Sequence, residues 1–211
     1  MSDRIRGIVS LTILAIAAAA LLAYTNEATR DRIDANKLML LQQGLRDVLP
    51  AQQYDNRPHE DVIYVASPEL LGSEQSLPIY RARYNGKPVA AAITAVAPDG
   101  YVGHIKLLVA VDMSGRIIAA RAVEHSETPG LGDAIDANKS SWMTLFSGRR
   151  LASNDGEDWR VRRDGGDIDQ ITGATVTSRA VVNATRDALH YFARHRDEIF
   201  EPASQEVATS N

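Results

Sequence analysis

The chain has 211 residues, with 23 lysines and arginines against 27 aspartates and glutamates, and its formal net charge is −4. It has no cysteine, so iron–sulfur clusters, disulfides and cysteine nucleophiles are excluded. The mildly acidic balance, with scattered basic residues, predicts that nucleic acid is not a partner. Hydrophobic residues make up 45% of the chain and charged residues 24%, which is typical of a globular domain with a core.

Residues 7–24 form an apolar stretch without a charged residue. At about 1.5 Å per residue, a helix of this length crosses most of a hydrocarbon layer roughly 30 Å thick, so we predict a single transmembrane helix. A cleavable signal peptide is the alternative, because Arg4 and Arg6 precede the stretch and its alanines offer cleavage sites. The stretch exceeds the usual signal core of about 7–15 residues and no compact polar segment follows it, which favours a retained anchor.

The flanking charges predict the orientation of this helix. Arg4 and Arg6 lie close to its start, whereas Glu27 precedes Arg30, the first basic residue after it. Because positive residues near a span favour the cytoplasmic side, we expect residues 1–6 to form a cytoplasmic tail. The large C-terminal part of the chain is then expected outside the cytoplasm.

Residues 25–50 are predicted to form a connecting helix, because apolar residues recur at helical spacing until Pro50 stops the pattern. These apolar positions are Ile33, Leu38, Leu41, Leu45 and Val48. Residues 51–200 are assigned to the main domain, and the tail 201–211 is expected to be flexible.

Strand patterns dominate the first half of the main domain, and Asn85-Gly86 is a strong hairpin signal between the first two strands. In the third strand a strictly apolar face alternates with a mixed one. The predicted strands are residues 79–84, 89–96, 104–111 and 117–124.

Helical patterns follow at residues 138–146 and 177–194, with a last short strand predicted at 159–162. The chain therefore lacks the strand–helix–strand alternation of a parallel sheet. We predict an α+β fold with a mainly antiparallel sheet and flanking helices.

The sequence contains no familiar catalytic signature, whether a dinucleotide loop, a phosphate-binding loop, a zinc-protease helix or a serine-hydrolase elbow. Its five histidines do not cluster at ligand spacing, and the acidic residues of 154–169 lack the ordered spacing of a calcium loop. We therefore predict no catalytic residue and no metal site.

The segment ETPGLG at 127–132 is predicted to form a tight turn directly after a strand. Gly130 and Gly132 permit unusual backbone angles and leave backbone amides uncovered. Such a turn can approach a flat ligand closely.

The segment TGATVTS at 172–178 immediately precedes the last amphipathic helix. Small residues and hydroxyls at a helix N-terminus favour an anion site, because first-turn N–H groups lack intrahelical partners and the helix dipole attracts negative charge. The alternative is ordinary helix capping, for which one serine or threonine hydroxyl is enough.

These two motifs, in this order behind a single N-terminal span, resemble the FMN-binding domain of the G subunit of the Rnf/Rsx electron-transport complex. That family is related to the C subunit of the sodium-pumping NADH:quinone reductase. The resemblance implies that a separate flavin transferase attaches FMN to Thr175 through a phosphoester bond. Gly173 and Ala174 would leave room for the phosphate, while Thr177 and Ser178 would donate hydrogen bonds to its oxygens. Thr172 opens the motif.

The resemblance also places the ETPGLG turn, which begins at Glu127, against the isoalloxazine ring. Thr128 and the amides near Gly130 and Gly132 would meet its polar edge, and Leu131 would cover its face. Trp142 is a further candidate for stacking on the ring, with a place in the core as its alternative.

The implied function is that of a redox relay in the bacterial inner membrane, with the domain on the periplasmic side and no catalytic site of its own. The relay would pass electrons among carriers on the NADH and ferredoxin side of a complex that couples electron transfer to ion translocation. Its partners would be the A, B, C, D and E subunits of that complex. The alternative is a membrane-tethered scaffold or assembly protein without a cofactor.

Overall fold

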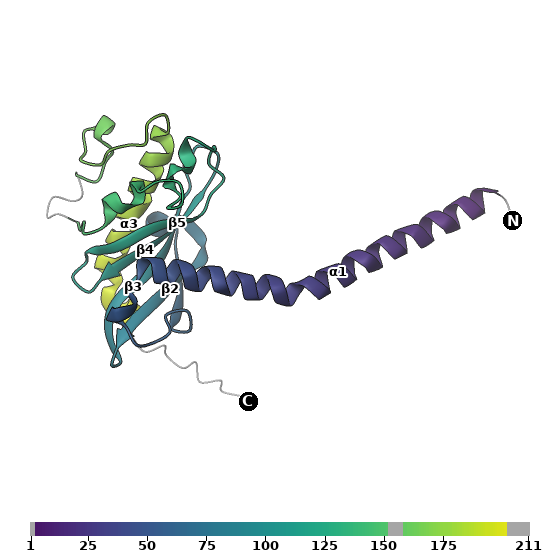
Figure 1. The fold of residues 1–211 in the computed structure, drawn as a ribbon, viewed down its shortest axis with the longest axis horizontal. Helices are drawn as coiled ribbons and strands as arrows, with labels where there is room; N and C mark the ends of the chain where they lie inside the picture. The colour runs from purple at the N-terminus through teal and green to yellow at the C-terminus, as the bar shows by residue number, and fades with distance from the viewer. Residues whose placement is uncertain (1–2, 152–157, 202–211) are drawn as a thin grey trace. The chain divides into compact units, whose positions relative to one another are not determined.

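The computed structural model describes residues 3–151 and 158–201, and it divides the chain into two compact units, residues 1–42 and 43–211 (Figure 1). The predicted flexible tail beyond residue 201 lies outside the described residues, as do the first two residues of the predicted cytoplasmic tail and residues 154–157 of the acidic segment.

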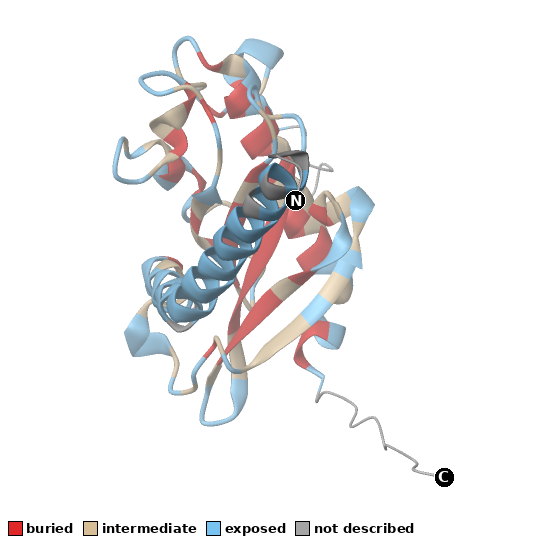
Figure 2. Cartoon of the chain, turned by 90° about the vertical axis from the view of Figure 1, so that its right-hand side faces the viewer, coloured by how far each residue is buried: buried red, intermediate tan, exposed pale blue. Residues whose placement is uncertain are grey.

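Helix α1 (Asp3–Val48) makes up nearly all of the first unit, and its apolar part is long and hydrophobic enough to cross a membrane. The helix predicted at 25–50 is the uninterrupted continuation of the apolar segment, because no glycine or proline occurs between residues 25 and 43. Its surface is exposed until the last turns, which Figure 2 shows in pale blue.

The second unit is built on a five-stranded antiparallel sheet whose strands lie in chain order. The Asn85-Gly86 hairpin is confirmed, and both residues adopt positive φ angles, 50° and 74°. The strands are β1 (Val62–Ser67), β2 (Ser73–Tyr84), β3 (Lys87–Ala97), β4 (Ile105–Asp112) and β5 (Ile117–Glu124).

The sequence patterns identified β2 to β5 but missed β1 and the first half of β2. The start of β2 is polar and exposed, and Pro78 interrupts the strand signal there. Pro78 is tolerated in the sheet because its neighbour is the short edge strand β1, where it lies opposite Tyr64.

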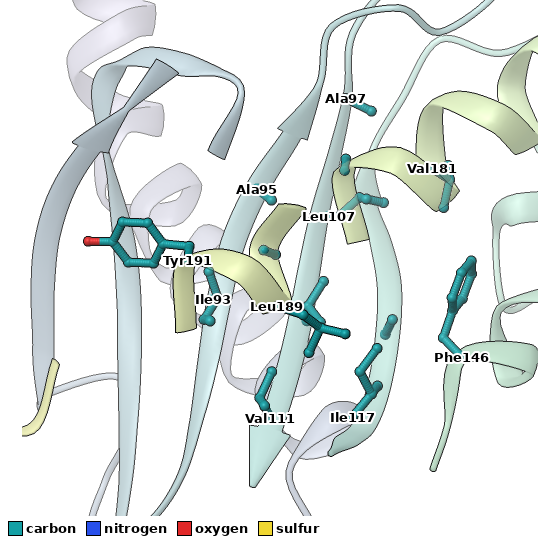
Figure 3. Close-up of a cluster of buried hydrophobic side chains, with 14 of the residues drawn as sticks. Ile93, Ala95, Ala97, Leu107, Val111, Ile117, Phe146, Val181, Leu189 and Tyr191 are labelled. Atoms are coloured by element: carbon teal, nitrogen blue, oxygen red, sulfur yellow. The ribbon is translucent and has the colours of Figure 1, made fainter. Parts of the chain in front are cut away.

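One face of the sheet packs against α3 (Thr175–Phe200), and their side chains form the main core (Figure 3). Leu107 and Val109 of β4 lie on this face, together with Val181 and Leu189 of α3. The opposite face was expected to be mixed, but Leu108 and Ala110 are also buried. Within the second unit the end of α1 packs there: a Cβ on Gly44 would lie 4.0 Å from the Leu108 side chain.

Short helical segments complete the domain, and several differ from the sequence predictions. The helix predicted at 138–146 is only the 3-10 turn η3 (Trp142–Phe146), and the strand predicted at 159–162 is wrong. Val161 makes a single bridge to Ile168, after which the chain enters η4 (Arg162–Asp164). The remaining segments are η1 (Ala51–Gln53), α2 (Pro68–Leu71) and η2 (Gly132–Ile135).

Two arginines of β2 hold the C-terminal end of α3. Arg81 Nη1 donates to the carbonyl oxygen of Glu201 at 2.9 Å, and Arg83 Nη2 donates to that of Phe200 at 3.2 Å. Both guanidinium groups bind Asp61, with Nε–Oδ distances of 2.6 and 2.8 Å. The last carbonyl groups of α3 are thus satisfied by the sheet, which places the whole helix and therefore its N-terminal end.

Candidate functional site

A cavity of about 420 Å³ opens where α3 begins. Its walls come from the β3–β4 loop, the turn after β5, η4 and the first turn of α3. The fold therefore brings together the two motifs recognised in the sequence. The lining residues are Tyr101, Glu127, Thr128, Leu131, Gly132, Arg163, Gly173, Ala174, Thr175, Val176 and Thr177.

The first turn of α3 carries no side-chain cap. The helix begins at Thr175, and its N-cap residue is Ala174, which has no hydroxyl to cap it. The interpretation of the motif as a helix cap is therefore wrong for this structure. Thr175 is half-buried and lines the cavity. The uncapped N–H groups and the helix dipole favour an anion at this position.

Two hydroxyls of the motif have partners inside the protein. Ser178 Oγ donates to the Ala174 carbonyl oxygen at 2.9 Å and accepts the Ile171 N–H at 2.9 Å. Thr177 Oγ1 donates to Glu127 Oε2 at 2.6 Å. Both hydroxyls are buried, and both donate their protons within the protein. In this structure Thr177 and Ser178 therefore do not offer protons to a phosphate, contrary to the prediction.

Glu127 is a buried carboxylate, 5% exposed, in the wall of the cavity. Besides the Thr177 hydroxyl, it accepts the Val102 N–H at 3.2 Å. Two glycines leave space for it: a Cβ on Gly132 would lie 2.6 Å from Oε2, and one on Gly100 would lie 2.8 Å from Oε1. Because Gly132 has no side chain, there is room for the Glu127 carboxylate. The prediction was that Gly132 leaves a backbone amide uncovered for a ligand.

The other predicted glycines also have defined local roles. Gly130 has a φ of 78°, but its N–H donates to Asp133 Oδ1 at 2.8 Å, so this amide is not uncovered as expected. Gly173 has a φ of 80°, which favours glycine, and a Cβ there would lie 3.0 Å from the Leu131 side chain. Gly173 thus keeps the cavity open beside Thr175.

Three large apolar side chains are exposed at the cavity. Leu131 was predicted, whereas Tyr101 and Val176 were not, and their exposed fractions are 47%, 70% and 44% respectively. They come from three separate segments, and such a gathering of exposed apolar groups indicates a surface that binds the apolar part of a ligand. Tyr101 lies in an irregular loop without periodicity, so the sequence offered no signal for it.

Arg163 adds a positive charge that the sequence analysis also missed, because it lies in a run of mixed charges. The neighbouring Asp164 is bound by Arg179 at 2.6 and 2.9 Å. Hydrogen bonding by Arg179, followed by the charges of Arg179, Arg163 and Arg160, holds the pKa of Asp164 below its usual value despite some desolvation.

Some predicted residues lie away from the cavity walls. Thr172 is exposed and does not line the cavity, and neither do Gly130 and Ser178. Trp142 packs edge-on against Phe146 at 5.3 Å between ring centroids, and its indole N–H donates to the Asp169 carbonyl oxygen at 2.7 Å. The alternative prediction, that Trp142 packs against the core, therefore describes this residue better than stacking on a ligand.

Residues 100–190, which include every residue lining the cavity, match the FMN-binding domain family. The cavity is thus part of a flavin mononucleotide-binding domain preceded by a helix of membrane-spanning length.

Two relatives are similar over nearly the whole chain. The G subunit of the ion-translocating oxidoreductase complex of Shewanella oneidensis is 43% identical over 190 residues, with 90% of each chain covered. The protein of the same name from Aliivibrio fischeri strain MJ11 is 43% identical over 189 residues, again with 90% of each chain covered. This chain belongs to the family of G subunits of the ion-translocating oxidoreductase complex, which confirms the resemblance seen in the sequence.

Among solved structures, the crystal structure of Shewanella oneidensis NqrC is similar, with a TM-score of 0.48 and 20% sequence identity. The match covers 69% of this chain and 74% of that one.

Proposed function

We propose that this chain is the membrane-anchored, FMN-carrying electron-transfer subunit of an ion-translocating oxidoreductase complex, and that its FMN is attached to Thr175 through a phosphoester bond. The observation that carries the proposal is the position of Thr175. This threonine opens an uncapped helix at the wall of a cavity inside an FMN-binding domain.

The residues present fit the two ends of FMN. At the phosphate end, Thr175 offers its hydroxyl, Gly173 leaves space, and the first-turn N–H groups and Arg163 supply positive potential. At the ring end, Leu131 and Tyr101 offer exposed apolar surface. The fit therefore rests on the combination, within one cavity, of one cationic side chain and backbone N–H donors for the phosphate with apolar side chains for the ring.

FMN, when bound, would supply one- and two-electron transfer, and the protein would position and shield it. The chain's own residues bind and orient it. Thr175 provides the covalent anchor, Leu131 and Tyr101 shield apolar surface from water, and the Glu127–Thr177 hydrogen bond holds two cavity walls together. No general acid or base is required of these residues, because Thr175 is an attachment point.

The covalent bond would be formed by a separate flavin transferase. It would break the phosphoanhydride bond of a flavin dinucleotide donor and join the FMN phosphorus to Thr175 Oγ1, while the hydroxyl proton is lost and the other nucleotide of the donor leaves as a monophosphate. A covalent link suits a relay, because the cofactor is retained whatever its affinity in either redox state. The scaffold alternative would leave this cavity and the uncapped helix without a ligand.

We further propose that the partners of this chain are the A, B, C, D and E subunits, and that α1 docks against membrane subunits of that complex in the bacterial inner membrane. Residues 1–6 would then lie in the cytoplasm and the FMN domain in the periplasm. Residues 17–20 are consecutive alanines, and such small residues allow close helix packing in a membrane. Electrons would pass through this protein from carriers on the NADH and ferredoxin side while the complex translocates ions.

The test is an intact-mass measurement of the full-length chain from membranes that contain active flavin transferase. We expect an increase of one FMN less one water, and a fluorescent band on a denaturing gel. Thr175→Ala should abolish both. Thr144→Ala is the control, because Thr144 is an exposed threonine outside both motifs and does not line the cavity. A dark wild-type band of unmodified mass would overturn the covalent proposal and favour the scaffold alternative.

A further inference from the structure

Another cavity, of about 330 Å³, lies between α3 and the segment around η4. We call it the arginine groove. Its lining includes three arginines and one aspartate, so the formal charge of the lining is +2, whereas the formal net charge of the whole chain is −4. The groove shares no lining residue with the cavity at Thr175. The lining residues are Arg160, Val161, Asp164, Arg179, Asn183 and Arg186.

The spacing of polar residues on α3 forms one side of the arginine groove. Arg179, Asn183 and Arg186 follow one another at intervals of four and three residues, so they lie along one face of the helix. Asp164 lies on the other side of the groove, and its hydrogen bonds from Arg179, of 2.6 and 2.9 Å, join the two sides. The fold therefore holds these arginines together at a fixed place on the surface.

The arginines of the groove have N–H donors left for another acceptor. Arg179 directs Nε and Nη2 at Asp164, and Arg186 directs the same two nitrogens at Asp187 Oδ1, each at 2.9 Å. A guanidinium group has five N–H donors, so both arginines keep those of Nη1. Arg160 is exposed, and within residues 3–151 and 158–201 it has no ion pair within 4.0 Å.

The chemistry of the groove favours carboxylates as its ligands. A guanidinium fork matches the two oxygens of a carboxylate, and the arginines of this surface already bind aspartates of the chain itself. The side chain of Arg186 is only 26% exposed, which strengthens its attraction for an anion. Because the lining keeps an excess of two positive charges after its own aspartate is counted, a ligand with two carboxylates would neutralise it.

We propose that the arginine groove binds an acidic segment of another subunit of the complex. This inference rests on the proposed function, because it takes the chain to be part of such a complex. An acidic segment supplies several carboxylates side by side, and the half-buried Asn183 offers an amide group to its backbone. Charge complementarity of this kind gives an interface its specificity and fixes its register.

The first experiment tests for a carboxylate in contact with the groove. Arg160→Lys keeps the positive charge and supplies a primary amine, which a carbodiimide couples to a touching carboxylate with loss of water. The full-length variant is treated in membranes from cells that produce the whole complex, and mass spectrometry identifies the coupled peptides. We expect an amide bond between position 160 and an aspartate or glutamate in an acidic segment of another subunit.

The matched control for this coupling is Arg196→Lys. Like Arg186, Arg196 lies on α3 and pairs with the aspartate that follows it, but it does not line the groove. We expect the yield of an amide to another subunit at position 196 to be at least about fivefold lower than at position 160, because no excess of positive charge attracts a carboxylate there.

The second experiment tests whether charge holds the contact. In the Arg160→Lys background, Arg186→Glu should lower the yield of the amide about five- to tenfold, because like charges then face each other. Replacing a second carboxylate of the identified segment by arginine should restore the yield, which a variant that fails to fold cannot do. Arg196→Glu should leave the yield unchanged.

The inference is overturned if position 160 forms no amide with another subunit, or only one with Asp164 of the same chain. Equal yields at positions 160 and 196 would overturn it too. A groove that binds inorganic phosphate or a lipid headgroup instead would give no amide to another subunit. The proposed function is judged separately by the mass of one attached FMN, so a chain that carries FMN but forms no such amide contradicts this inference alone.

Discussion

Thr177 Oγ1 donates a 2.6 Å hydrogen bond to Glu127 Oε2 across 50 residues of sequence. Glu127 also accepts the Val102 N–H at 3.2 Å, so one buried carboxylate connects the β3–β4 loop, the turn after β5 and the first turn of α3. These segments form the cavity walls around Thr175. The hydrogen bond therefore links the stability of the fold to the geometry of the proposed flavin site.

Replacing Thr177 by valine should destabilise the domain. Valine keeps the shape but leaves a carboxylate oxygen buried without its hydroxyl donor, which costs on the order of 1–3 kcal/mol. Thr177→Ser is the control, because it keeps the hydroxyl. Denaturant unfolding of the full-length chain measures the difference, and equal midpoints for the two variants would contradict the assigned role of the hydrogen bond.

Replacing Gly132 by alanine should also be destabilising, because the new Cβ would lie 2.6 Å from Glu127 Oε2. The size of the effect should depend on Glu127. In a Glu127→Ala background the carboxylate is absent, and we expect Gly132→Ala to cost at least about 1 kcal/mol less than in the wild type. A double-mutant cycle measures this coupling. Additive effects of the two substitutions would show that Gly132 is required for another reason.

The arginines that hold the end of α3 should matter more for stability than exposed arginines. Arg81 is 7% exposed and binds Asp61 as well as carbonyl groups at the end of the helix, so Arg81→Met should cost about 1–3 kcal/mol by removing these charge-assisted hydrogen bonds, while Asp61 stays paired with Arg83. The exposed pair Arg57–Glu60 provides the comparison, and Arg57→Ala should change stability by less than about 1 kcal/mol. Similar unfolding midpoints for the two variants would contradict this ranking.

The stability of the domain should fall at alkaline pH through Tyr80. Burial, with a smaller contribution from the charge of Tyr64, raises the pKa of Tyr80 from 10.0 to about 12. The folded chain then holds this proton more tightly than the unfolded chain, so the contribution is fully present below pH 10 and is lost between pH 10 and 12. Thermal unfolding followed across this range should show a shallower decline in Tyr80→Phe. Parallel declines would assign the loss to other groups.

Local patterns were sufficient to predict much of the architecture. The apolar run of residues 7–24, four of the strands, the Asn85-Gly86 hairpin and most of α3 follow from periodicity and turn chemistry, which depend on neighbouring residues. Predictions were wrong where tertiary packing decides local structure. The segments at 138–146 and 159–162 are irregular because their apolar residues are spaced to reach the core, as the stacking of Phe146 on Trp159 shows.

The same division applies to the proposed flavin site. The sequence by itself determined the class of the protein and the position of Thr175, because the motif, its place ahead of a helix and the family are all encoded locally. Only the tertiary structure decided which hydroxyls are free and which charge lies at the cavity. The Thr177 hydroxyl donates to Glu127. Arg163 lines the cavity because the ion pair between Asp164 and Arg179 holds its segment against α3. Such contacts join residues far apart in sequence, and their geometry is defined only when the sheet and α3 pack together.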